Sequence, residues 1–150
     1  MRDLNDFAKK LKGISDALPE NVDKLLKDVV REVHRELVQS TPRDTGRAVT
    51  NWQTTTREPA EGVLYSQPQR PPSPEAGAAR SVAEMQTIVD GAEPLSTYYI
   101  QNNAPYIGRL DAGSSRQAPA NFVSRAAHRG RALIKGAAGR IFVEVKKGKG

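Results

Sequence analysis

The sequence contains no cysteine and only two histidines among its 150 residues. The absence of cysteine excludes disulfide bonds, thiol catalysis and cysteine-based zinc sites. The two histidines, His34 and His128, lie far apart in the sequence. We therefore expect no histidine-rich metal centre.

Apolar and aromatic residues are also scarce, at 37% and 5% of the chain, and the mean hydropathy is -0.59. No run approaches the roughly 20 apolar residues of a membrane span, and the N-terminal residues lack the apolar segment of a secretory signal. We expect a soluble protein made in the cytoplasm, with no membrane partner. Its core should be small, so that part of its apolar surface needs a neighbouring subunit.

Signatures of catalysis are missing as well. No segment resembles a nucleophile elbow or a glycine-rich phosphate loop with its lysine. Most carboxylates lie beside basic residues at helical spacing, where solvated ion pairs are expected. The sequence therefore predicts a protein that is not an enzyme and uses no cofactor.

Positive charge is concentrated near the C-terminus, within a net charge of +6. From Ser124 onward a single acidic residue, Glu144, is set against eight basic ones: Arg125, Arg129, Arg131, Lys135, Arg140, Lys146, Lys147 and Lys149. Such a segment suits nucleic acid or an acidic protein surface. A solvated helix face that ends in a basic tail at 146–150 is the alternative interpretation.

The clearest element is a helix from Pro19 to Ser40. Proline and a following glutamate suit the first turn of a helix. One stripe of this segment is apolar: Val22, Leu25, Leu26, Val29, Val33 and Leu37. Three ion pairs are expected on its other side: Asp23 with Lys27, Asp28 with Arg31, and Glu32 with Arg35.

Strand-like segments follow the turn at 44–46. Residues 47–57 are rich in threonine and predict a strand, whose Trp52 should share a face with Ala48, Thr50 and Thr54 and anchor the core rather than stack on a ligand. Residues 63–65 and 96–100 predict two further short strands. Four prolines and no large apolar residue predict an extended, mobile loop over 66–79.

Further helices are expected before, between and after the strands. Their predicted ranges are 4–14, 81–89, 105–110 and a long C-terminal helix from about Pro119 to Ile141, with Phe122, Ala126, Leu133, Ala137 and Ile141 in one band. The expected fold class is α+β, with N-terminal helices, a small, mainly antiparallel sheet and this long C-terminal helix. The length fits a single domain over residues 1–150.

Three sequence blocks together resemble a known family. The first is Thr41-Pro42-Arg43-Asp44-Thr45-Gly46-Arg47, followed by Asn51-Trp52; the second runs from Tyr99 to Ile107 and on through Arg109-Leu110-Asp111-Ala112-Gly113; the third runs from Ser115 to Val123. In this order they resemble the neck and minor tail-component proteins of tailed bacteriophages, which complete the tail or join it to the filled head. The family has glutamate more often at the position of Asp111.

The residue types in these blocks have a physical rationale. Asp44 can accept hydrogen bonds from backbone amides in the turn, and Gly46 permits a backbone conformation that other residues resist. Asn103 tolerates a tight bend, Pro105 can begin a short helix that presents Tyr106, and Pro119 presets the last helix. We expect these residues to be structural.

The resemblance implies a structural protein of the virion, located at the head–tail interface and in the host cytoplasm during assembly. Its expected partners are copies of itself in a ring of six or twelve, and the other neck, connector and tail proteins. Arg125, Arg129, Arg131 and Lys135 are the candidates for subunit or genomic DNA contact. Two alternatives remain open: a nonspecific DNA-binding module that uses the basic C-terminal helix, and a tail-terminator or head-closure ring protein of the same assembly.

Overall fold

The computed structural model describes residues 19–66, 68–105, 107–111, 121–133 and 141–145. Its elements, in chain order, are α2 (Pro19–Ser40), α3 (Arg47–Thr50), β1 (Trp52–Thr56), α4 (Pro74–Gly91), β2 (Tyr98–Asn102), α5 (Ile107–Asp111), α6 (Phe122–Leu133) and β3 (Ile141–Val145). The predicted helix over 4–14 and the basic tail at 146–150 lie outside the described residues. None of the described helices has the length and apolar character to cross a bilayer.

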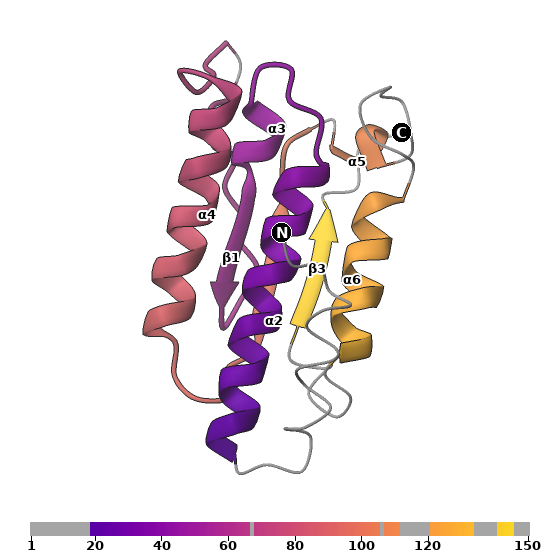
Figure 1. The fold of residues 1–150 in the computed structure, drawn as a ribbon. Coiled ribbons are helices and arrows are strands. Elements are labelled where there is room, and N and C mark those ends of the chain that lie inside the picture. Colours follow the sequence, from indigo (N-terminus) through magenta and orange to yellow (C-terminus); the bar gives the residue numbers. More distant parts are fainter. Residues whose placement is uncertain (1–18, 67, 106, 112–120, 134–140, 146–150) are drawn as a thin grey trace.

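The architecture is α+β, with a three-stranded sheet in the order β1-β2-β3. Figure 1 shows α4, α2 and α6 side by side over one face of this sheet, with α2 in the middle. β1 pairs antiparallel with β2, whereas β2 pairs parallel with β3. The sheet is therefore mixed rather than mainly antiparallel, because the chain crosses over through α6 before it returns as β3.

The helix predicted over Pro19–Ser40 is confirmed in its bounds. All three expected ion pairs form along it, at nitrogen–oxygen distances of 3.0–3.4 Å. Its apolar stripe faces the core, where Leu26, Val29 and Leu37 have no exposed surface. Here the local pattern and the tertiary packing agree.

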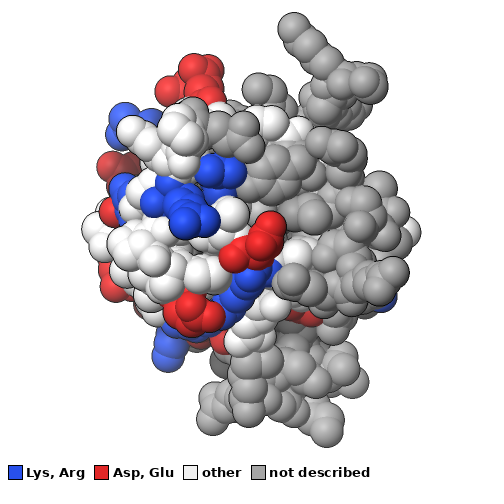
Figure 2. Space-filling model, turned by 90° about the horizontal axis from the view of Figure 1, so that it is seen from above, with Lys and Arg blue, Asp and Glu red and all other residues white. Residues whose placement is uncertain are grey.

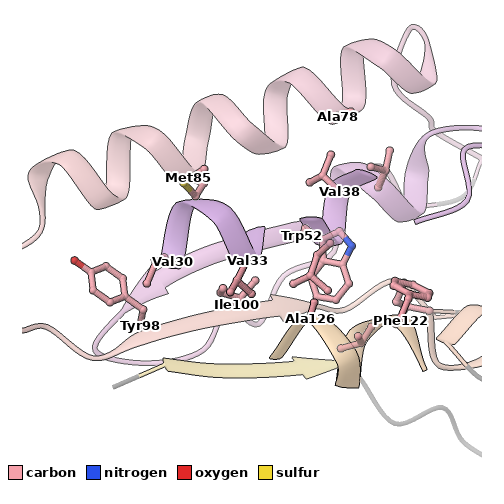
Figure 3. Packing of buried hydrophobic residues seen from close by; sticks show 14 of the residues in the cluster. Val30, Val33, Val38, Trp52, Ala78, Met85, Tyr98, Ile100, Phe122 and Ala126 are labelled. Carbon is pink, nitrogen blue, oxygen red and sulfur yellow. The ribbon is translucent and has the colours of Figure 1, made fainter. Parts of the chain in front are cut away.

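Figure 3 shows the core around Trp52, with Val38 above it and Ile100 and Ala126 nearby. Trp52 is 1% exposed and is among the largest fully buried side chains. Met85 points from α4 toward α2 and is completely buried. The core is therefore assembled from all three long helices and the inner face of the sheet.

Several sequence predictions differ from the structure. The strand predicted over 96–100 and the helix predicted over 105–110 each begin two residues later, as β2 and α5. Residues 47–50 form the short helix α3, and only 52–56 form the strand, so Ala48 and Thr50 share no strand face with Trp52. Residues 63–65 form no strand. The proline-rich loop ends at Ser73, because Pro74 lies in the first turn of α4 and the Ser73 hydroxyl accepts a hydrogen bond from the Ala76 amide at 3.0 Å.

The long C-terminal helix is a further difference. α6 ends at Leu133, and Ile141, expected on the same helix face, begins β3 instead. Isoleucine, phenylalanine and two valines over 141–145 favour a strand, and β2 offers an edge with which they pair. The helix predicted over 81–89 is confirmed as part of the longer α4.

Candidate functional site: a polar network of the signature residues

Gly46 lies at a close contact between two segments. Its φ of 88° is in the left-handed region and it is the N-cap of α3. A Cβ at this position would lie 2.7 Å from Pro74 Cα and 2.9 Å from Pro71 Cγ. Glycine is therefore required here both for its backbone conformation and for the approach of the proline segment.

The hydroxyl that accepts a hydrogen bond within this turn belongs to Thr45, whose Oγ1 lies 3.2 Å from the Arg47 amide nitrogen. Asp44, for which the sequence predicts this role, is exposed. The turn is thus held by the threonine of the Asp-Thr-Gly motif.

Arg47 is 7% exposed and binds the loop that follows β1. Its Nε donates to the carbonyl oxygens of Tyr65 at 2.8 Å and Gln69 at 2.9 Å, and a terminal guanidinium nitrogen donates to Gln69 at 2.6 Å. Hydrogen bonds from a charged donor are stronger than neutral ones and offset part of the desolvation of the guanidinium. Arg47 therefore holds the proline-rich loop against α3, a role that the motif alone does not predict.

Asn51 holds the same loop through its side-chain amide. Its Nδ2 donates to Arg47 O at 2.7 Å and Leu64 O at 2.9 Å, while its Oδ1 accepts from Leu64 N at 2.7 Å. The side chain thereby pairs with residue 64 as a neighbouring strand would, although residues 63–65 form no strand. Like Arg47, Asn51 belongs to the first sequence block, which by itself does not predict these contacts.

Trp52 connects β1 to the end of α2. Its Nε1 donates to Thr41 Oγ1 at 2.7 Å, and that hydroxyl donates to Leu37 O at 2.7 Å. The buried indole nitrogen is therefore satisfied, as a buried polar group must be.

The second sequence block meets the first at the end of β2. Asn102 Nδ2 donates to Ala48 O at 2.9 Å, and Asn102 Oδ1 accepts from Ala104 N at 3.0 Å. Asn103 Nδ2 donates to Ala60 O at 2.7 Å. The two asparagines therefore connect three backbone segments, which extends the bend predicted for Asn103.

Asp111 connects the second block to the third. Its Oδ1 accepts from Val123 N at 3.0 Å, and its carbonyl oxygen accepts from Asn121 N at 2.6 Å. A carboxylate at the first turn satisfies free amides and interacts favourably with the helix dipole. Asp111 therefore caps α6, and Asn121, with a φ of 62°, occupies the turn before it. Pro105 is exposed two residues before α5; Tyr106 and Pro119 lie outside the described residues.

A second buried network lies around His34, beneath α4. His34 Nδ1 lies 2.7 Å from Thr54 Oγ1, and Nε2 lies 2.8 Å from Ser81 Oγ. Because the Ser81 hydroxyl donates its proton to Trp52 O, Nε2 carries the histidine proton and Nδ1 accepts from Thr54. Burial lowers the pKa of His34 from 6.5 to about 3, so the ring is neutral in the folded protein.

The structure describes two of the four basic side chains that the sequence singles out as candidates for subunit or DNA contact. Arg125 and Arg131 are exposed on α6, whereas Lys135 and the Arg129 side chain lie outside what is described. Beside them, between α6 and β3, is a groove of about 400 Å³ lined by Val123, Ser124, Ala127, His128, Arg131 and Val143.

The charge at one end of the molecule is mixed. Figure 2 looks onto the end where α2 finishes and α4 begins, and Lys and Arg side chains there have Asp and Glu side chains around them. The uniform basic surface that favours nucleic acid is not present on the described part of this end.

The signature side chains thus hold backbone segments together: Thr41, Arg47, Asn51, Trp52, Asn102, Asn103 and Asp111 all bind main-chain groups or each other. Within the described ranges, no group of three or more His, Asp or Glu residues could hold a metal ion. Comparison of the chain with known protein families, with curated proteins and with solved structures gives no match.

Proposed function

We propose that this chain is a structural protein of a tailed-phage virion, a neck or tail-completion subunit that helps to join the tail to the DNA-filled head. One observation carries the proposal: the three sequence blocks that resemble this family meet in space. Asn102 pairs with Trp52 of the first block in the sheet and donates to Ala48, which lies between the two parts of that block. Asp111 joins the second block to the third.

The chemistry of these contacts supports a role through shape. Among the described signature residues, Arg47, Asn51 and Asp111 bind the chain's own backbone, where they hold the loop after β1 and the start of α6. Buried polar networks that are fully satisfied make a structure rigid and specific. A rigid surface is what a subunit needs if it acts by fitting between other proteins.

The proposed location is the head–tail interface, where rotational symmetry about the tail axis applies to each layer. The proposed partners are copies of the chain in a ring of six or twelve, together with neck, connector and tail proteins. A ring requires a heterologous interface, in which one patch of a subunit meets a different patch of the next. A tail-terminator or head-closure ring would meet the same requirement.

A nonspecific DNA-binding module is the second candidate. It is supported by α6, which carries three arginines and no acidic residue, with Arg125 and Arg131 exposed. Such binding would depend on phosphate contacts and weaken steeply with salt.

Electron microscopy of particles from a phage that lacks this protein tests the proposal. Separate full heads and finished tails are the expected result, since joining would fail after both parts are complete. Overlong tails would indicate termination instead. Normal, infectious particles would refute the structural role.

A further inference from the structure

The two outer helices of the helical layer differ in charge. α4 carries Glu75, Glu84 and Asp90 against Arg80, whereas α6 carries three arginines and no acidic residue. The two helices lie on opposite sides of α2 (Figure 1). One subunit therefore presents acidic and basic helices at opposite edges.

The exposed face of α4 is suited to close packing. Ala76, Ala79 and Ala83 are exposed along one side of α4. Glu84 and Ile88, which are one turn apart, are exposed along the neighbouring side, and Ile88 is a large hydrophobic residue that is 37% exposed. Alanines allow another helix to approach closely, and a partner that covers this part of α4 would also bury the exposed surface of Ile88.

The opposite edge offers a concave surface. The groove between α6 and β3 has an apolar base formed by Val123, Ala127 and Val143, with Ser124 and His128 exposed at its rim. An apolar centre with a polar rim is the usual composition of a protein interface.

We propose that the exposed face of α4 packs against the α6–β3 groove of a second copy of this chain, with Ile88 in the groove and Glu84 beside Arg125. The inference deepens the proposed function, on which it rests, by naming the surfaces that join neighbouring subunits. Figure 1 shows α4 and α6 running in the same direction, each opposite to α2. Their C-terminal ends lie at a similar height in this view, so rotation about an axis along these helices keeps the C-terminal half of α4 at the level of α6 in the next copy. The contact is heterologous and can close into a ring.

Cross-linking between introduced cysteines tests this arrangement, because the natural chain has none. In the Ile88→Cys/His128→Cys variant, a short bismaleimide should link each copy to the next, and a denaturing gel should show a ladder that stops at the ring's copy number. Each single variant can yield no more than a dimer. The control pair Ile88→Cys/Arg70→Cys places its second cysteine at an exposed loop position away from α6 and should not give the ladder.

A charge exchange supplies an independent readout. Glu84→Arg and Arg125→Glu should each weaken association by about two- to fivefold, as expected for a pair at an interface rim. The double variant should recover it. Because α4 and α6 lie on opposite sides of α2 within one subunit, recovery would show a contact between copies.

The outcomes separate this interface from the proposed function. If cross-linking gives only monomers and dimers, both with purified protein at high concentration and with particles, the proposed interface is wrong. This holds even if particles that lack the protein still fail to join heads to tails. If particles do not contain the protein, the proposed function fails, and the purified protein alone decides the interface. A third outcome would assign the exposed face of α6 to DNA. In that case Arg125→Glu loses duplex DNA binding, adding Glu84→Arg does not restore it, and the cysteine variant gives no cross-linked ladder.

Discussion

Acidification should destabilise the protein through His34, the buried histidine between α2, β1 and α4. The ring is neutral in the folded state, because burial lowers its pKa to about 3 from the ordinary value of 6.5. The unfolded chain therefore binds a proton below pH 6.5 that the folded chain does not bind until about pH 3. The stability contributed by His34 is thus fully present above pH 6.5 and is lost as the pH falls.

The magnitude follows from the width of this interval. Each pH unit within it changes the free energy of unfolding by about 1.4 kcal/mol for one group. Between pH 6.5 and pH 5 the loss should be about 2 kcal/mol, a large part of the stability of a small domain. Confining the measurement to this range limits the contribution of carboxylates, which titrate mainly at lower pH.

Urea unfolding at pH 7 and pH 5, followed by tryptophan fluorescence, is a suitable assay, since Trp52 is the only tryptophan. The His34→Gln variant should be less stable than the parent at pH 7, because the contacts with Thr54 and Ser81 change, but it should lose the 2 kcal/mol difference between the two pH values. The matched control is His128→Gln, at an exposed position on α6, which should keep the parental difference. A His34→Gln variant with the same pH dependence as the parent would refute the reasoning.

Three further predictions concern packing, each measured by denaturant unfolding. Trp52→Ala should cost about 3–5 kcal/mol, because it leaves a cavity in the core and removes the hydrogen bond to Thr41; a variant as stable as the parent would contradict the role as core anchor. Gly46→Ala should cost on the order of 2–4 kcal/mol from left-handed backbone strain and contact with the proline segment, whereas Gly62→Ala, which adds a methyl group with no atom within 4 Å, should change stability little. Gly130→Ala should destabilise the contact between α6 and α2 by about 1–3 kcal/mol, since the new Cβ would overlap Val33 Cγ2. Adding Val33→Ala should relieve part of that loss. Additive effects of the two changes on stability would argue against direct contact.

Elements with a strong local signal were predicted well from the sequence. The helix from Pro19 to Ser40 combines start signals, an apolar stripe and three ion pairs, so its bounds follow from short-range physics. The burial of Trp52 was expected because a large aromatic side chain removes much apolar surface from water. These features need no knowledge of the remainder of the chain.

Other features depend on which segments become neighbours. Val49 lies in α3 rather than in a strand, because the left-handed turn at Gly46 begins a helical turn whose residues are all buried. Ile141 fits a helical period and a strand equally well in local sequence, and the free edge of β2 decides between them. Hydrophobic periodicity and secondary-structure propensity are weak predictors where tertiary packing offers a segment a pairing partner.

The polar network shows the same division. The sequence alone determined which residue types stand in the motif blocks, and it predicted a structural role for Gly46 and Asn103. The tertiary structure decided their partners: Arg47 with the loop carbonyls, Asn102 with Ala48 and Asp111 with the start of α6. The reason is that a side-chain amide, guanidinium or carboxylate can satisfy many backbone groups, and only the folded chain determines which of them lie within about 3 Å.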